Sequence, residues 1–89
     1  MISDPFARTQ DSPTSPAEAC FAIIPDDVAE LPVATKGIYI GGDGDVAIIT
    51  LNNSAPVTFR NLLAGTVLDV RARAIMATGT TATDMVGLY

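Results

Sequence analysis

Apolar positions follow a strand-like pattern along most of the chain after Lys36. Isoleucine alternates with glycine and tyrosine over 37–41, and 46–51 is a nearly continuous β-rich run, which is typical of a strand buried on both faces. In the next segment Val57 and Phe59 are expected to point inward. Over 66–78 leucine, valine and alanine alternate with charged residues, which predicts one strand with a polar face.

The remaining segments complete an all-β pattern. Residues 19–24 have strand composition, 25–32 is an acidic loop between two prolines, and 85–89 predicts a last short strand. Turn signals separate about six or seven short strands, and no convincing helix is present. This spacing predicts a small antiparallel β-sandwich or barrel.

The first seventeen residues differ from the rest of the chain. They hold three of the six prolines together with Ser, Thr, Asp and Gln, and they show almost no periodic apolar pattern. We therefore expect residues 1–17 to form an extended polar N-terminal arm and residues 18–89 to form a single β domain. Phe6 is the one large aromatic group of the arm, and it is a candidate anchor where the arm docks.

Composition and charge narrow the function. Apolar residues make up 48% of the 89 residues and charged residues only 17%, so we expect a small domain that hides part of its surface in a partner. The net charge of −5 argues against binding to nucleic acid. No apolar run approaches the ~20 residues of a membrane-spanning helix, so membrane insertion is not expected.

Catalytic residue types are scarce. The chain has no histidine, so it lacks both the commonest general base and the commonest metal ligand. Its one cysteine, Cys20, lies next to Phe21, and we expect a buried structural thiol in a protein that folds in a reducing compartment. We predict that the protein is not an enzyme, and we assign no catalytic, cofactor-binding or metal-binding residue and no cofactor.

The sequence GGDGD at 41–45 is the most site-like motif. It lacks the third glycine of a dinucleotide-binding loop, and the lysine of a phosphate-binding loop is also missing. It departs from the calcium-binding β-roll repeat because the sixth position is Val46. Glycine tolerates positive φ, and Asp-Gly is a preferred hairpin dipeptide. We predict a tight β-hairpin with its tip at Gly42, Asp43, Gly44 and Asp45, and an ion or ligand site remains the alternative.

Charged residues on the predicted strands give a candidate interface. Asp69, Arg71 and Arg73 share one face, and Arg60 is expected on a neighbouring strand. Such a face is either solvated and self-screened or a subunit interface in which guanidinium groups pair with carboxylates. The threonines around Gly79 are expected to be structural or interfacial, because no base lies near them in the sequence to activate a hydroxyl.

The order of segments from Ser15 onward resembles a known family. The relevant stretches are SPAEACFAIIPDD, ELPVATKGIYIGGDGDVAI and VTFRNLLAGTVLDVRARAIMATGTTATDMVGLY. They are similar to the head-spike base protein of gene transfer agents and related tailed-phage-like particles. The most specific part is AGT-L-VR-R followed by ATGTTAT and a C-terminal G-L-Y. Asp69 and Lys36 depart from the pattern, where proline and arginine are expected.

The resemblance implies a structural adaptor. It implies a homo-oligomeric ring, pentameric in the family, at a capsid vertex, with the capsid protein and a spike fibre protein as partners. The particle would be assembled in the bacterial cytoplasm, and the arm would dock on the capsid or on an adjacent subunit. The alternatives are a tail, baseplate or capsid decoration protein, and a small carbohydrate- or calcium-binding β-module that uses Asp43 and Asp45.

Overall fold

The structure is a computed structural model that describes residues 15–89, so Phe6 lies outside the described residues. Over this range the chain forms seven strands and no helix, which confirms the predicted all-β class. Accordingly, no helix in the described part is long and apolar enough to cross a membrane. The strands are β1 (Cys20–Ala22), β2 (Gly37–Tyr39), β3 (Gly44–Thr50), β4 (Val57–Leu62), β5 (Val67–Leu68), β6 (Ala72–Ile75) and β7 (Val86–Leu88).

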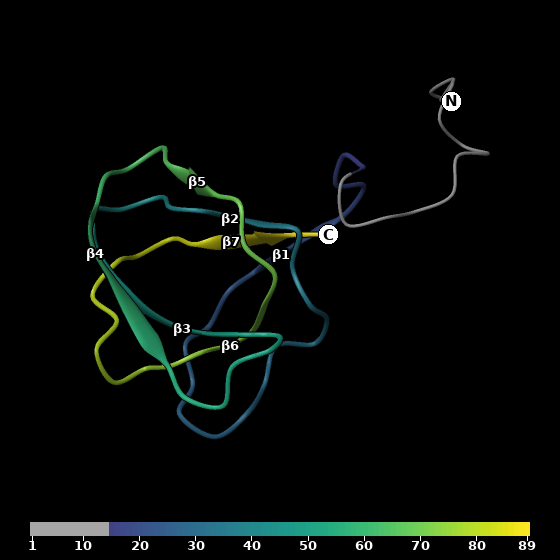
Figure 1. The fold of residues 1–89 in the computed structure, drawn as a ribbon. Helices are drawn as coiled ribbons and strands as arrows, with labels where there is room; N and C mark the ends of the chain where they lie inside the picture. The colour runs from purple at the N-terminus through teal and green to yellow at the C-terminus, as the bar shows by residue number, and fades with distance from the viewer. Residues whose placement is uncertain (1–14) are drawn as a thin grey trace.

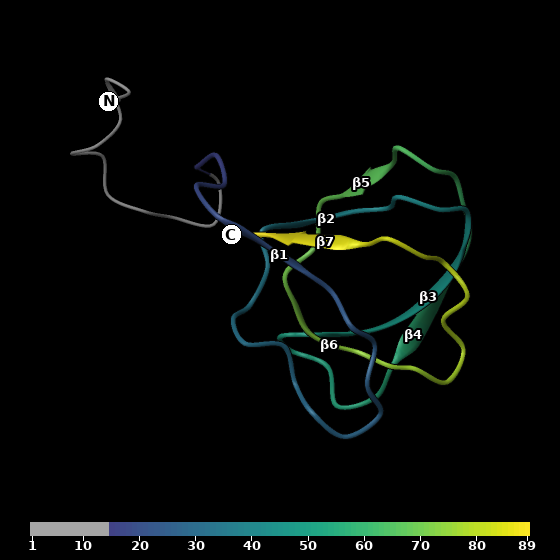
Figure 2. The ribbon, with the colours of Figure 1, turned by 180° about the vertical axis from the view of Figure 1, so that it is seen from behind.

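The strands form two antiparallel sheets. The four-stranded sheet has the order β1-β7-β2-β5, and the three-stranded sheet has the order β4-β3-β6. In Figure 1 and, from behind, in Figure 2, β5, β2 and β7 run side by side above β3 and β6, while β4 runs down one side. The architecture is therefore a β-sandwich.

The core lies between the two sheets. Ile38 and Ile40 come from the four-stranded side and Ile48 and Ile75 from the three-stranded side, and all four are essentially inaccessible to water. Burying a side chain of this size stabilises a fold by about 1.5–3 kcal/mol. The alternation seen in the sequence around Ile38 thus marks the inner face correctly.

The predicted hairpin around GGDGD is wrong. β2 and β3 flank this segment, but they belong to different sheets and do not pair with each other. β2 pairs with β5 and β7, whereas β3 pairs with β4 and β6. The glycines therefore carry the chain from one layer of the sandwich to the other, a path that local turn chemistry cannot distinguish from a hairpin.

The predicted single strand over 66–78 is also interrupted. It divides into β5 in one sheet and β6 in the other. Thr35, which is fully buried, holds the crossing: its hydroxyl donates to the carbonyl of Val70 at 2.9 Å and accepts from the amide of Ala72 at 3.0 Å. The in-and-out alternation survives the crossing, because Ala72 is buried while Asp69 and Arg71 are exposed.

Two predicted burial states are corrected by strand position. Cys20 is exposed, because β1 is an edge strand and its first residue lies on the outer face of the sheet. Val57 is 53% exposed although it pairs with the core residue Ile48, because β4 is an edge strand as well.

Candidate functional site: an apolar sheet face

The GGDGD segment lies against the loop that precedes β7. A Cβ on Gly41 would come within 2.7 Å of the Cβ of Asp84, and one on Gly44 would come within 2.7 Å of the Cα of Ala82. Gly42 forms an isolated antiparallel bridge with Thr83. The glycines are therefore required by close contact with residues 81–84, and Gly44 in addition has a positive φ of 155°.

The aspartates of the segment point to a different loop. Asp43 accepts a hydrogen bond from the amide of Ala64 at 2.5 Å, and Asp45 accepts one from the amide of Asn61 at 2.9 Å. Asn61 has a positive φ of 60°, so Asp45 fixes an uncommon backbone conformation at the end of β4. Among residues 15–89 no group of three or more acidic or cysteine side chains is placed to hold a metal ion. The segment connects two loops, and its carboxylates are engaged by backbone donors.

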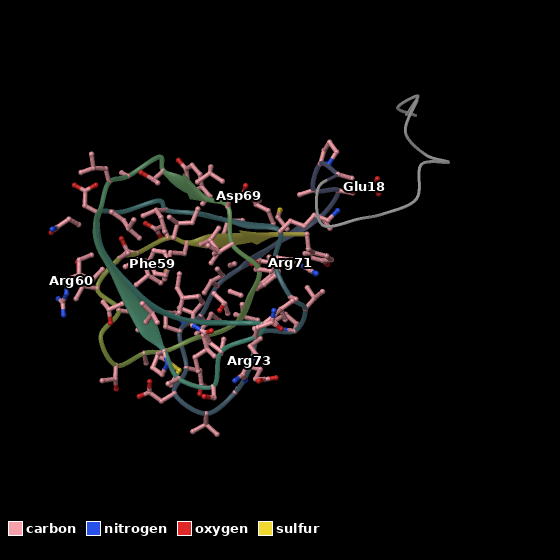
Figure 3. All side chains as sticks on the ribbon, viewed as in Figure 1. Glu18, Phe59, Arg60, Asp69, Arg71 and Arg73 are labelled. Carbon is pink, nitrogen blue, oxygen red and sulfur yellow. The ribbon has the colours of Figure 1, made fainter. Side chains whose placement is uncertain are left out.

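The predicted charged interface does not form one patch. Arg60 lies on β4, and β3 separates that strand from β6, which carries Arg73. Arg60 contacts Asp45 at 3.4 Å and projects from the side of the molecule away from Arg71 and Arg73 (Figure 3). The expected neighbouring-strand placement of Arg60 is therefore wrong.

Two of the three remaining candidates are engaged within the chain. Arg73 pairs with Glu30 and donates to the carbonyl of Asn53 at 2.9 Å. Arg71 donates from Nε to the carbonyl of Thr35 at 3.3 Å. Asp69 is exposed beside a hollow described below. Among the described residues, Arg73 therefore joins the loops that contain Glu30 and Asn53 to β6. Arg71 joins the segment that contains Thr35 to the residues just before β6.

The acidic loop 25–32 is fixed by its own aspartates. Asp26 accepts from the amides of Ala29 and Val28, and these hydrogen bonds lower the pKa of Asp26. Asp27 accepts from the amide of Thr78 at 2.9 Å and from its hydroxyl at 2.7 Å, which lowers the pKa of Asp27. Both carboxylates are thus stabilised in the charged form.

Threonine hydroxyls of the loop 77–83 accept hydrogen bonds from amides of β3 in the three-stranded sheet. Thr80 Oγ1 accepts from the amide of Ala47 at 3.0 Å, and Thr81 Oγ1 accepts from the amide of Asp45 at 2.9 Å. The expected structural role of these hydroxyls is confirmed for both residues. The loop passes over the outer side of this sheet, where Gly79 approaches Ala47.

Among residues 15–89, the edge strands of the four-stranded sheet stay open on their outer face, where Cys20 and Ala22 of β1 and Val67 of β5 are exposed. Directly paired residues share a face, and the register places two rows outward, opposite the core row that contains Ile38. Val67 is 55% exposed and Tyr39 40% exposed. One row is Ala22, Val86, Tyr39 and Val67, and the other is Cys20, Leu88 and Gly37.

This face is chemically unusual. An antiparallel sheet exposed on one side commonly alternates apolar residues inside with polar residues outside. Here none of the seven outward residues carries a charge, and tyrosine supplies the only hydroxyl. Contiguous exposed apolar surface of this kind marks an interaction site in a soluble protein.

A hollow of about 340 Å³ opens at one end of the face. Its floor is Gly37, which has no side chain, and Val67 and Leu88 flank it. Lys36 and Asp69 add one charge of each sign to its lining. Ser15 and Ala17 also line the hollow, so the first described residues pass beside it.

Sequence reasoning missed this face. The strand composition of 85–89 and of 19–24 was apparent, but which of the two apolar faces of the sheet is exposed to water depends on the pairing of β1, β7, β2 and β5. The sequence nonetheless indicates such a face. In β2, β5 and β7 the residues that point to either side of the sheet are apolar or glycine, as expected for strands covered on both sides.

Comparison with known proteins gives an informative likeness to a solved structure. No family model and no curated protein sequence matches the chain. A chain in the solved structure described as "Capsid of native GTA particle computed with C5 symmetry" is similar, with 32% sequence identity and a TM-score of 0.86. The match covers 98% of this chain and 100% of that one. Identity at this level over the full length of both shows common descent, and the chain belongs to the family of that GTA (gene transfer agent) capsid chain.

Proposed function

We propose that this protein is a structural adaptor of a gene transfer agent or related phage-like particle. In this proposal it forms a homo-oligomeric, pentameric base at a capsid vertex and attaches a spike fibre. The capsid likeness over the whole chain supports a particle component, and the C5 symmetry used for that structure agrees with a ring of five.

The apolar outer face of the four-stranded sheet is the observation that carries the proposal. A domain of this size has a marginal core of its own, and an exposed face without charge would promote association. Proteins that function as monomers in water rarely expose a contiguous apolar face of this kind. A chain that packs into an assembly buries it.

A ring also requires two different contact surfaces on each copy, because cyclic assemblies larger than a dimer are built head to tail. The apolar face is one candidate. The region around Arg60, which projects from a different side of the molecule, is a candidate for a second contact with a neighbour, the capsid protein or the fibre protein. Its guanidinium is largely exposed despite the contact with Asp45.

Mass in solution tests the ring. Light scattering coupled to size exclusion should give about five times the 9.2 kDa of one chain. A mass of one chain at high concentration would contradict the proposal. A different closed ring would retain the adaptor and correct its stoichiometry.

Electron microscopy tests the location. Particles made in cells that lack this chain should keep a closed capsid and lose density at the fivefold vertices. Loss of tail or baseplate density would instead favour a tail component. Loss of density spread evenly over the capsid surface would favour a decoration protein.

A further inference from the structure

The hollow at Gly37 is built to take a side chain. Its floor lacks a Cβ, its flanks are the alkyl groups of Val67 and Leu88, and its lining includes Lys36 and Asp69. A Cβ on Gly37 would meet the Leu68 carbonyl oxygen at 3.3 Å, Val67 at 3.5 Å and Leu88 at 3.7 Å, so the glycine keeps the floor of the hollow open. The chemistry fits an aromatic or alkyl group accompanied by one positive and one negative charge.

The segment 1–14 carries this set of groups. Phe6 is its aromatic residue, Asp4 precedes it by two positions and Arg8 follows it by two. In an extended segment, residues two apart lie on the same face. Phe6 in the hollow would therefore bring Asp4 and Arg8 to the side of the segment that faces Lys36 and Asp69. The Lys36 ammonium already donates to Ser15 Oγ at 3.1 Å and to the carbonyl of Pro16 at 3.5 Å, so Asp4 would join an ammonium group that has partners in its own chain.

The length of the segment favours a neighbouring copy. Ser15 already lines the hollow of its own chain. Eight residues, 7–14, separate it from Phe6, and a chain between these two positions can span up to ~30 Å, about the diameter of a small domain. That reach is sufficient for Phe6 to contact the hollow of an adjacent copy, whereas contact with the hollow of its own chain would require the chain to reverse direction within these eight residues.

We propose that residues 1–14 of one copy dock on the apolar outer sheet face of an adjacent copy, with Phe6 in the hollow at Gly37. The inference rests on the self-association proposed above and names the surface that accepts the arm. Asp4 and Arg8 then set the direction of the arm, because the reverse orientation would oppose like charges.

Photo-crosslinking tests both the contact and the partner. Phe6 is replaced by benzoylphenylalanine, which keeps an aromatic side chain, in an equal mixture of unlabelled and ¹⁵N-labelled full-length protein. After irradiation, mass spectrometry should find position 6 joined to the peptide containing Val67 or Leu88, with mixed isotope labels. Links only within one isotope form would overturn docking on a neighbour. Links only to the 52–56 turn would overturn the choice of surface.

The same replacement at Val28 is the matched control. Val28 is 93% exposed and apolar, but it lies in the 25–32 loop beside β6 and not on this face. Equal linking of positions 6 and 28 to the peptide containing Val67 would mean unspecific contact and would overturn the proposal.

Substitutions provide an independent test by sedimentation velocity. Phe6→Ala and Val67→Lys should each weaken self-association by at least tenfold. Val28→Lys should leave it unchanged, because Val28 is 93% exposed and lies in the 25–32 loop, away from this face. Melting curves of the Val67→Lys and Val28→Lys variants should overlap under dissociating dilution, since both side chains are exposed.

The outcomes separate the two proposals. If the unsubstituted chain assembles and all three variants assemble as strongly as it does, the arm contact is overturned and the ring proposal stands. A monomeric unsubstituted chain at high concentration would overturn the ring and, with it, the arm contact between copies.

Discussion

At the scale of single residues, the fold depends on a few polar groups in special places. Thr35 is the only buried polar residue among those described, and its hydroxyl serves both the carbonyl of Val70 and the amide of Ala72. These two backbone groups lie where the chain passes from β5 in one sheet to β6 in the other. One hydroxyl therefore supplies the hydrogen-bond partner of both backbone groups at this crossing.

Replacing Thr35 with valine should cost about 1–3 kcal/mol of unfolding free energy, because the shape is kept while two backbone groups lose their partner. Thr35→Ser is the control. It keeps the hydroxyl and should cost less, about the ~0.8 kcal/mol of one buried methyl group. Urea denaturation at a fixed protein concentration measures both. Equal losses in the two variants would show that packing, and not the hydroxyl, accounts for the effect.

At the scale of elements, loops form backbone hydrogen bonds with the edges of the sheets. Amides of Asp26, Leu31 and Thr35 donate to carbonyls of β6, so the 25–35 segment covers the β6 edge of the three-stranded sheet. On the other side of the molecule the GGDGD segment contacts residues 81–84 and 61–64. The contact between Asp27 and Thr78 ties the acidic loop to the threonine loop.

The tie between Asp27 and Thr78 makes stability depend on pH. Its hydrogen bonds hold the folded-state pKa of Asp27 below the ordinary value of 3.8, so the stabilisation is present above that value and is lost as the pH falls through the folded-state pKa. Asp27→Asn should therefore lower the melting temperature at pH 7, and the difference from the unsubstituted chain should shrink below about pH 4.

The matched control for this prediction is Glu18→Gln, which removes an exposed carboxylate on the β1 side of the molecule (Figure 3). Its melting temperature should follow that of the unsubstituted chain across the same pH range. A difference for Asp27→Asn that stays constant down to pH 2 would contradict an electrostatic origin of the effect.

How far the sequence predicts these elements depends on the range of the interactions. Alternation around Ile38 and Ala72 was sufficient to identify strands and their inner faces, because it reports a local period. It could not assign β2 and β3 to different sheets, since pairing of β2 with β7 joins residues far apart in the chain. Gly44 shows the same limit: a turn glycine and a glycine packed against Ala82 look alike in sequence.

At the scale of the whole molecule, the protein combines a core of fully buried isoleucines with an uncharged outer face. The exposure of Val67 and Tyr39 follows from sheet order and not from their own neighbours in sequence. For that reason the prediction that the chain hides surface in a partner could be made from composition, whereas the surface itself could not be located.

Self-association should couple to stability. For a chain that assembles, the melting temperature rises with protein concentration, because association favours the folded form. A tenfold increase should raise it by several degrees, since about 1 kcal/mol corresponds to ~4–8 °C in a domain of this size. Differential scanning fluorimetry over two decades of concentration measures the slope. A flat response would contradict an assembly whose interface forms only in the folded state.

The outward position of Cys20 has a practical consequence. It is the single cysteine of the chain, and it lies in the same row of the outer sheet face as Leu88 and Gly37. A thiol-reactive dye therefore attaches at one known point of the unaltered protein. The rate of that labelling reads out directly, and without any substitution, whether the face is open to water or covered.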